Sequence, residues 1–383
     1  MQPIYLDNNA TTAVDARVVA ALTPYMTELY GNPSSLHALG ERAAAAVAQA
    51  RAHVARLICA PTRRVVFTSG GSESNQTAIS AAAARAGARR RILTSEIEHA
   101  AVLEPTAALA SRGFEVERLG VDEHGRVRID ELERALDERV ALVSVMWANN
   151  ETGVVQDVAR VRELSARCGA LLHVDAVQAV GKIPIDVGAT GADFVSLSGH
   201  KLHAPKGVGA LYVRDDTLLE PLIRGGPQEL ERRGGTENVP GVVGLGEAAR
   251  LARQWLDGDD ATRLCELRDS LEDELLERLD GVVLHGRAAP RVPNTSSLRL
   301  EGVSGEALTQ WLSAEGVCVS TGAACSASRH QPSHVLLAMG LSPAQASGSL
   351  RISLSRLTTP EEVERAAELV VRGAGALRAL ASP

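Results

Sequence analysis

The fold is decided by residues 65–75, which read VVFTSGGSESN. An apolar run, a pair of glycines and an alanine-rich stretch follow one another here, which predicts a strand, a tight turn and the start of a helix. Glycines let the backbone approach a ligand closely, and the N–H groups at a helix start attract an anion. Gly71 and Ser72 are therefore candidate phosphate-binding residues, although a glycine turn with Ser72 as the helix cap explains the same letters.

Strands and helices alternate on both sides of this segment. Many of the strands are apolar on both faces, as in a largely parallel sheet covered by helices. Helical patterns such as Asp130–Glu138 and Val158–Cys168 separate them. The sequence therefore predicts an α/β fold with a mainly parallel seven-stranded sheet. The expected strands are Arg64–Thr68, Arg91–Thr94, Phe114–Leu119, Val140–Met146, Ala170–Val174, Ala192–Leu197 and Gly207–Val213.

After about residue 255 the pattern changes to a smaller α+β unit. We expect a large domain over residues 15–255 and a small domain formed by residues 1–14 and 256–383. The elements expected after residue 255 are an amphipathic helix at Ala261–Leu279, strands at Val282–Leu284 and Ser296–Leu300, and helices at Gly305–Ala314 and from Glu361.

Composition excludes several classes of protein. The 383 residues carry 40 Lys and Arg against 47 Asp and Glu, a net charge of −7, which argues against nonspecific nucleic-acid binding. No run of about 18 uncharged apolar residues occurs, and the start MQPIYLDNNATT lacks the features of a secretory signal. Five scattered cysteines do not suggest a disulfide framework. We expect a soluble, cytoplasmic protein in which at least one thiol is functional.

Two later strands end in residues that carry chemistry. The run LLHVD places Asp175 at a strand's carboxyl end, the edge where α/β sheets bind ligands. About twenty residues later, FVSLSGHK places Ser198, His200 and Lys201 in the same way. A lysine near an apolar strand end is costly unless it is paired or covalently engaged. Taken singly, Asp175 could be a helix cap and Lys201 a surface lysine.

Together, a phosphate cradle, an aspartate and a lysine match the needs of pyridoxal phosphate. This cofactor requires a phosphate grip, an acid partner for its pyridinium nitrogen and a lysine for its Schiff base. A nicotinamide dinucleotide fits poorly, because GGSESN is not the GxGxxG fingerprint and no early acidic residue follows at a strand end.

The chain resembles the cysteine desulfurases of the NifS/IscS class, which belong to the aminotransferase-like pyridoxal-phosphate enzymes of fold type I. The resemblance runs nearly end to end. Its marks are YLDNNATT (5–12), GNPSSLH (31–37), FTSGGSESN (67–75), EHAAV (98–102), NNETGVVQ (149–156), HVDAVQAVGK (173–182), SGHKLHAPKGVGAL (198–211), GGTENV (234–239) and STGAACSAS (320–328).

The resemblance implies roles around the cofactor ring. Lys201 would carry the cofactor as a Schiff base, and Asp175 would hold the pyridinium proton. Gln178 would bond the ring hydroxyl, and His99 would stack on the ring and take part in proton transfer. Asn150 would lie beside the ring and the substrate. His99 as a surface histidine and Asn150 as a turn former are the alternatives that the residues alone leave open.

The resemblance also implies contacts with the phosphate and the substrate. Thr236 would reach the phosphate from the other subunit of a homodimer. Arg351 would grip the substrate carboxylate with its planar fork, unless it is a solvated strand-edge arginine. The remaining phosphate contacts would come from Gly71, Ser72, Ser198 and His200.

Cys325 is the candidate nucleophile, because the small residues around it, VSTGAACSAS, predict a mobile, exposed loop. Cys59, with apolar neighbours, is instead expected to be a buried structural cysteine, and Cys318 to fill the core of the small domain. A zinc site of Cys318, Cys325, His330 and His334 has unfavourable spacing, so we expect no metal. The two histidines are expected in a solvated loop and at a helix start.

The implied reaction converts L-cysteine to L-alanine and leaves sulfur on Cys325 as a persulfide. An acceptor protein would take the sulfur for iron–sulfur cluster assembly or for another thio-cofactor or tRNA modification. A selenocysteine lyase, a transaminase-type reaction and a catalytically silent scaffold for sulfur acceptors remain as alternatives. The segment from 225 departs from the family pattern, because Pro227 and Leu230 replace a glycine and an arginine.

Overall fold

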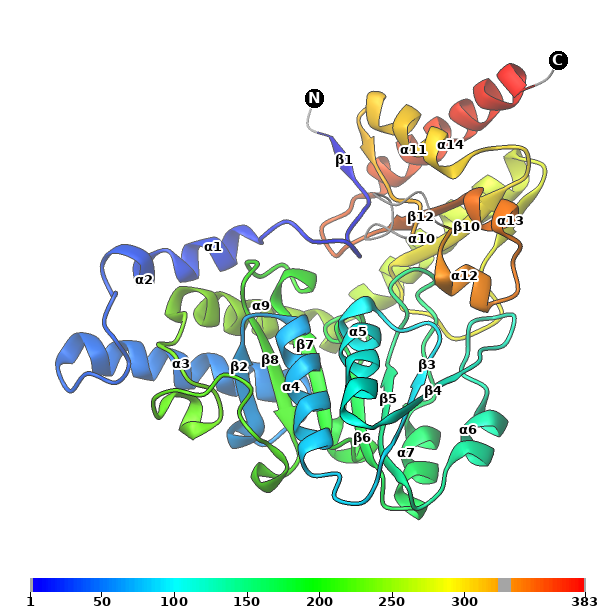
Figure 1. The fold of residues 1–383 in the computed structure, drawn as a ribbon. Coiled ribbons are helices and arrows are strands. Elements are labelled where there is room, and N and C mark those ends of the chain that lie inside the picture. Colours follow the sequence, from blue (N-terminus) through cyan, green and yellow to red (C-terminus); the bar gives the residue numbers. More distant parts are fainter. Residues whose placement is uncertain (1–2, 323–331, 382–383) are drawn as a thin grey trace.

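The computed structural model describes residues 3–322 and 332–381. Its largest sheet has seven strands, and helices surround this sheet (Figure 1). The strand order is β2-β8-β7-β6-β5-β3-β4. Every neighbouring pair is parallel except those made by β8, which runs against both of its neighbours. The strands are β2 Val65–Thr68, β3 Arg91–Ser95, β4 Glu115–Leu119, β5 Val140–Met146, β6 Leu171–Asp175, β7 Phe194–Ser198 and β8 Gly209–Val213. The seven predicted strands and the mainly parallel sheet are confirmed.

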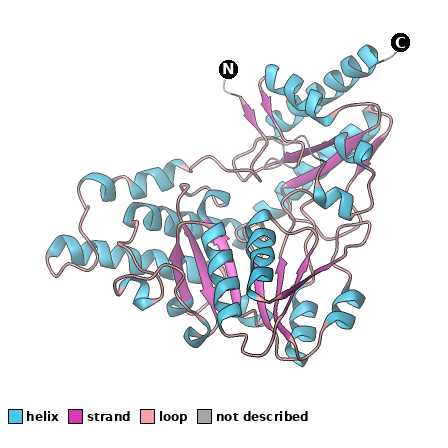
Figure 2. Ribbon diagram, viewed as in Figure 1, coloured by secondary structure: helices cyan, strands magenta, loops and turns pink. Residues whose placement is uncertain are grey.

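Helices cover both faces of this sheet, because its strands are apolar on both sides. In β2, Val65 and Phe67 join one buried cluster, whereas Val66 between them joins another. Figure 2 shows the resulting layers of helix and strand. Helices α3 Ala38–Leu57, α7 Val158–Arg167 and α9 Val239–Asp257 contribute to the first cluster, and α4 Gly71–Ala84 and α5 Ala100–Ala108 to the second.

A second unit holds most of the C-terminal third of the chain and the N-terminal strand. An antiparallel sheet of order β12-β10-β9 shares a buried cluster with α10, α11 and α14. Strand β1 pairs with β11 in parallel, which brings the first residues beside the C-terminal part (Figure 1). The bounds are β1 Ile4–Tyr5, β9 Val282–Leu284, β10 Thr295–Leu300, β11 Val317–Cys318, β12 Ser349–Ser353, α10 Asp260–Arg278, α11 Gly305–Ala314 and α14 Pro360–Ala381. The domain limits given above stay a prediction.

Short helices make up most of the remaining regular structure. None of the helices within residues 3–322 and 332–381 is long and apolar enough to cross a membrane. The bounds are α1 Ala16–Leu22, α2 Pro24–Thr27, α6 Ile129–Ala135, α8 Val187–Thr190, α12 His334–Ala338 and α13 Pro343–Ser347.

Two cysteines differ from the sequence prediction. Cys59 is exposed, so its prediction as a buried residue is wrong. It follows the end of α3 in a left-handed turn with φ of 53°, and this turn separates it from the buried Leu57 and Ile58. Cys318 lies in β11 but is only partly buried, so its prediction as a core residue is wrong, and the adjacent Val317 fills the core instead.

Candidate active site

The carboxyl ends of β6 and β7 open onto a pocket of about 810 Å³. The start of α4, the start of α5 and strand β12 of the second unit complete its wall. Of the predicted site residues that the structure describes, the pocket brings together all but Thr236. These residues are Gly71, Ser72, His99, Asn150, Asp175, Gln178, Ser198, His200, Lys201 and Arg351.

The first turn of α4 forms an open cradle at the wall of the pocket. The helix begins at Gly71, and its cap residue Gly70 supplies no side-chain hydrogen bond to the first N–H groups. A Cβ added at Gly71 would lie 2.8 Å from Cγ2 of Val177 and 3.5 Å from Cβ of Ser198. A side chain at this position would therefore fill the space that an anion can occupy at the helix start.

Asp175 is held in a fixed orientation at the end of β6. Its Oδ2 accepts a hydrogen bond of 2.7 Å from Nδ2 of Asn75, and its Oδ1 accepts one of 3.0 Å from the N–H of Val177. Oδ1 of Asn75 is buried and has no partner among the described residues. The amide of Asn75 thus orients the carboxylate expected to face the pyridinium nitrogen. Asn75 belongs to the FTSGGSESN motif, but no role for it was predicted from the sequence.

Lys201 extends from the turn after β7 toward the N-terminal segment. Its Nζ donates hydrogen bonds of 2.6 Å to the main-chain oxygens of Asn9 and Ala10. Beside it, Nδ1 of His200 lies 3.1 Å from Oγ1 of Thr11. Burial, reinforced by the charge of Lys201, lowers the pKa of His200 to about 4. His200 is therefore a neutral ring near pH 7.

His99 caps helix α5 and also lines the pocket. It caps α5, because its Nδ1 accepts a hydrogen bond of 3.1 Å from the N–H of Ala101. The neutral ring then carries its proton on Nε2. Burial lowers the pKa of His99; the charges of Lys201 and His334 lower it further, whereas Asp175 opposes this. The histidine is thus neutral near pH 7 at the wall of the pocket.

Arg351 in β12 is buried, with 2% of its side chain exposed. Its Nη2 donates to Oδ1 of Asp7 at 2.6 Å, and its Nη1 donates to the main-chain oxygens of Asn150 and Gly322, each at 3.1 Å. Nε is buried and has no partner among the described residues. The solvated strand-edge alternative is therefore wrong, and a guanidinium N–H remains that a carboxylate can satisfy.

Glu151 is a buried carboxyl group of the pocket that was not predicted from the sequence. Oγ of Ser333 donates to its Oε2 at 2.5 Å, and a Cβ added at Gly322 would lie 3.0 Å from the same oxygen. Burial raises the pKa of Glu151. Gly322 precedes and Ser333 follows the segment 323–331 in the sequence, so Glu151 lies beside described residues on both sides of that segment. Cys325 and His330 lie within this segment, outside the described residues.

Other predicted residues lie as follows. Thr236 is exposed and does not line the pocket of its own chain. His334 is exposed at the start of α12, as expected, and its Nε2 donates to the main-chain oxygen of Glu98 at 3.0 Å. Leu230 is 72% exposed with φ of 59°, in a short 3₁₀ segment after Pro227. Within the described ranges, no three His, Cys, Asp or Glu side chains are grouped to hold a metal ion.

Comparison of the sequence with known proteins identifies a family and close relatives. A family model described as aminotransferase class V matches residues 4–366. Cysteine desulfurase 2 of Trichormus variabilis is 47% identical over 380 residues, which cover 99% of this chain and 95% of the relative. A cysteine desulfurase of Cereibacter sphaeroides is 48% identical and covers 99% of this chain and 98% of its own length.

A solved structure has the same fold. A NifS-like protein superposes with a TM-score of 0.90 at 38% identity, over 97% of this chain and 99% of the neighbour. The seven-stranded sheet with its second unit is therefore a fold type I arrangement, and the cofactor of this family is pyridoxal phosphate. On this evidence, the chain belongs to the aminotransferase class V family and, within it, to the cysteine desulfurases.

Proposed function

We propose that this protein converts L-cysteine to L-alanine and takes the sulfur onto Cys325 as a persulfide. One observation carries the proposal: Lys201, Asp175 and Arg351 meet in one pocket. The pocket combines a primary amine, an oriented carboxylate and a buried guanidinium N–H that has no partner among the described residues. The relatives named cysteine desulfurase support the choice of substrate. So does SspA, solved in complex with cysteine, which is 34% identical with a TM-score of 0.81 over 93% of this chain and 99% of its own.

The residues of the pocket fit pyridoxal phosphate. Gly71 and Ser72 offer the helix start to the phosphate, with Ser198 and His200 beside them. Asp175 would face the pyridinium nitrogen, Gln178 would donate to the ring hydroxyl, and Lys201 would hold the cofactor covalently. Bound there, pyridoxal phosphate supplies an acceptor for the electrons released when a bond at the substrate's α-carbon breaks.

Three side chains of this protein act on the substrate. Arg351 binds the carboxylate through Nε and its planar fork, while Asp7 and Asn150 hold the guanidinium in place. The amine of Lys201 takes the α-proton. The neutral ring of His99, with its proton on Nε2, gives or receives a proton at the wall of the pocket.

The thiolate of Cys325 attacks the sulfur of the substrate, so that an S–S bond forms as the Cβ–S bond of cysteine breaks. The electron pair of the broken bond stays on the substrate carbon, which takes up a proton and leaves as alanine. An ordinary thiol with a pKa near 8.5 is only a few per cent ionised at pH 7, so the surroundings must favour the thiolate or the rate is limited. Sulfur held as a persulfide can then pass to an acceptor protein. We propose that this acceptor serves iron–sulfur cluster assembly or another thio-cofactor or tRNA modification, and that the enzyme is cytoplasmic.

A homodimer completes the site in this proposal. Thr236 is exposed and lies away from the pocket of its own chain, which supports a role on the partner's phosphate. Large apolar side chains are exposed as well: Met26 at 65%, Tyr30 at 70% and Leu230 at 72%. A second copy that covered these side chains would remove their apolar area from water.

Borohydride reduction tests the cofactor assignment directly. The purified protein is expected to be yellow, and reduction should fix the chromophore on the peptide that contains Lys201. The chain has two other lysines, Lys182 and Lys206, and label on either of them would overturn the assignment. A Lys201→Ala variant can still retain some cofactor through the phosphate cradle but should not turn over cysteine.

A further inference from the structure

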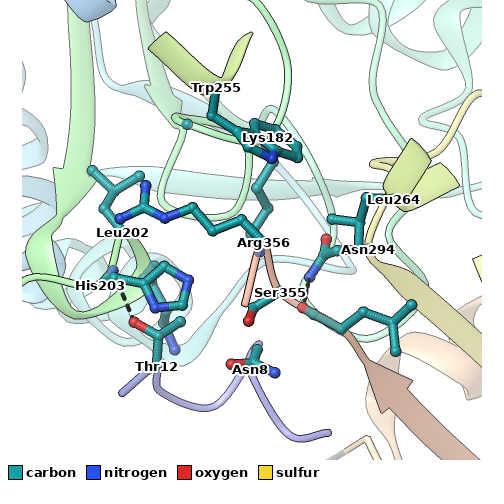
Figure 3. Close-up of a pocket in the computed structure, with 13 residues that line it drawn as sticks. Asn8, Thr12, Lys182, Leu202, His203, Trp255, Leu264, Asn294, Ser355 and Arg356 are labelled. Carbon is teal, nitrogen blue, oxygen red and sulfur yellow. Dashed lines mark hydrogen bonds between the residues drawn. The ribbon is translucent and has the colours of Figure 1, made fainter. Parts of the chain in front are cut away.

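Lys182 is a buried lysine behind the proposed active site. Its exposed fraction is 9%, and it lines a small cavity of about 30 Å³, large enough for a water molecule (Figure 3). Lys201 lines both this cavity and the large pocket. Lys182 lines the cavity but not the large pocket. Lys182 can therefore influence the pocket only through residues that lie between the two.

The surroundings of Lys182 are unfavourable for a cation. Lys201, His203 and Arg356 line the same cavity, and no carboxylate does so among the described residues. Burial, with the charges of Lys201 and Arg351, lowers the pKa of Lys182 well below its ordinary value. A buried amine without an acidic partner costs stability, so packing alone is a poor reason for its presence.

The composition of the chain adds an independent observation. Of its 40 basic residues only three are lysines, namely Lys182, Lys201 and Lys206, and the other 37 are arginines. The chain thus uses arginine for nearly every cation. A compact amine at position 182 indicates a need that the larger, planar guanidinium does not meet.

The hydrogen bonds of Lys182 show what a compact amine does at this position. Its Nζ donates to Oε1 of Gln178 at 2.5 Å and to Oδ1 of Asn9 at 3.0 Å. On the other side of the Gln178 amide, Nε2 donates to the main-chain oxygen of Asn9 at 2.9 Å. Because a carbonyl oxygen can only accept, the nitrogen of this amide must face Asn9 and its oxygen must face Lys182.

The same contacts connect Lys182 to the rest of the site. The main-chain oxygen of Asn9 that accepts from Gln178 also accepts from Lys201. Nδ2 of Asn9 donates to the main-chain oxygen of Asn150 at 3.1 Å. One N–H of the Gln178 amide is used by Asn9, and Gln178 lines the large pocket, so its second N–H is available to a ligand there.

We propose that Lys182 is a positioning residue that orients the amide of Gln178, so that the second N–H of this amide meets the ring oxygen of the cofactor. The inference rests on the proposed function, in which Gln178 contacts that oxygen. Without Lys182, Oε1 of Gln178 would be buried without a donor, and the amide could turn.

A double-mutant cycle tests this inference. Wild type, Lys182→Met, Gln178→Met and the double variant are compared for retention of pyridoxal phosphate and for the pH midpoint of its visible absorption. We expect each single variant to weaken retention about three- to tenfold and to raise the midpoint by roughly half a unit, because the ring oxygen loses a donor that stabilises its negative charge. The double variant should match Gln178→Met.

The controls separate orientation from a merely structural role. Lys206→Met removes an exposed lysine and should leave both readouts unchanged. Lys182→Gln keeps an N–H donor without a charge and should restore most of the midpoint shift; it also serves where thermal unfolding shows that Lys182→Met does not fold. Three results would each overturn the inference. The losses of cofactor retention in the two single variants could multiply in the double variant, Lys182→Met could keep the wild-type readouts, or Lys182→Gln could fail to restore the midpoint. Failure of the proposed function is seen separately, since wild type would then not bind the cofactor through Lys201.

Discussion

Oδ1 of Asp7 lies 2.6 Å from Nη2 of Arg351, although the two residues are 344 positions apart in the chain. The contact joins the N-terminal segment to strand β12 and fixes the guanidinium from one side. Main-chain oxygens of Asn150 and Gly322 fix it from another side, and Nε has no partner in the part of the chain that the structure describes. The site thus presents a guanidinium that is oriented before substrate arrives.

Arg351→Lys should weaken binding of the substrate carboxylate. An ammonium group cannot replace the planar fork, and a hydrogen bond to a charged group contributes about 1.5–3 kcal/mol. We expect the KM for cysteine to rise roughly 10- to 100-fold, with a smaller effect on kcat, in steady-state alanine assays. Arg365→Lys, at an exposed position of α14, is the matched control. An unchanged KM in Arg351→Lys would contradict this role.

Asn75→Ala should disturb Asp175 without removing its charge. The variant loses the donor that lies 2.7 Å from Oδ2, so the carboxylate can turn away from the pyridinium nitrogen. We expect turnover to fall about tenfold, as for the loss of one charge-assisted hydrogen bond, together with a changed visible spectrum of the bound cofactor. Gln76→Ala, which loses a hydrogen bond from Nε2 to Oγ of Ser80 on the same helix, should behave like wild type. Equal kinetics and spectra in the two variants would rule out this orienting role.

The sheet could be predicted because its evidence is local. Each strand is a short run that is apolar on both faces, as in Val140–Met146, and the glycine turn at Gly71 marks the helix start beside it. The residues at the strand ends, Asp175 and Lys201, follow from the same pattern. Their roles came from the resemblance to a family, and the pocket then brought them together.

The supporting residues could not be predicted because their contacts join distant segments. Asn9 meets Lys182 and Lys201 only after the N-terminal segment folds across the sheet, and no sequence spacing encodes this. The carboxyl group of Glu151 accepts its hydrogen bond from Ser333, which lies 182 positions later in the chain. Cys59 was mispredicted because a left-handed turn, not the apolarity of its neighbours, decides its exposure.

Glu98 predicts a pH dependence of stability. Burial raises its pKa to about 8 against 4.5 for the free residue, although hydrogen bonds from Ser95 and Met146 oppose the rise. From about pH 4.5 to 8 the folded protein binds a proton that the unfolded chain releases, so the free energy of unfolding falls as pH rises, by up to about 1.4 kcal/mol per unit.

Glu98→Gln should remove this contribution, as chemical denaturation at pH 5 and pH 8 can show. The exposed Glu96→Gln is the control and should keep the wild-type slope. A wild-type slope in Glu98→Gln would mean that Glu98 is ionised in the folded protein.

The position of Thr236, exposed and outside the pocket of its own chain, leads us to predict an active site shared between two chains. Thr236→Ala should weaken retention of pyridoxal phosphate, and Lys201→Ala should be inactive. Mixed dimers of the two variants would have one intact site and one site with both defects, so mixing should restore up to half of the wild-type activity. No gain on mixing, or a fully active monomer in sedimentation, would exclude the shared site.

The fate of the sulfur atom tests the central claim most directly. The purified protein is incubated with L-cysteine, alanine is quantified, and the persulfide is labelled and located by mass spectrometry. We predict one sulfur atom added on the peptide of Cys325, and no alanine from Cys325→Ala. Alanine formed equally well by Cys325→Ala, or turnover of selenocysteine by wild type without any alanine from cysteine, would contradict the account.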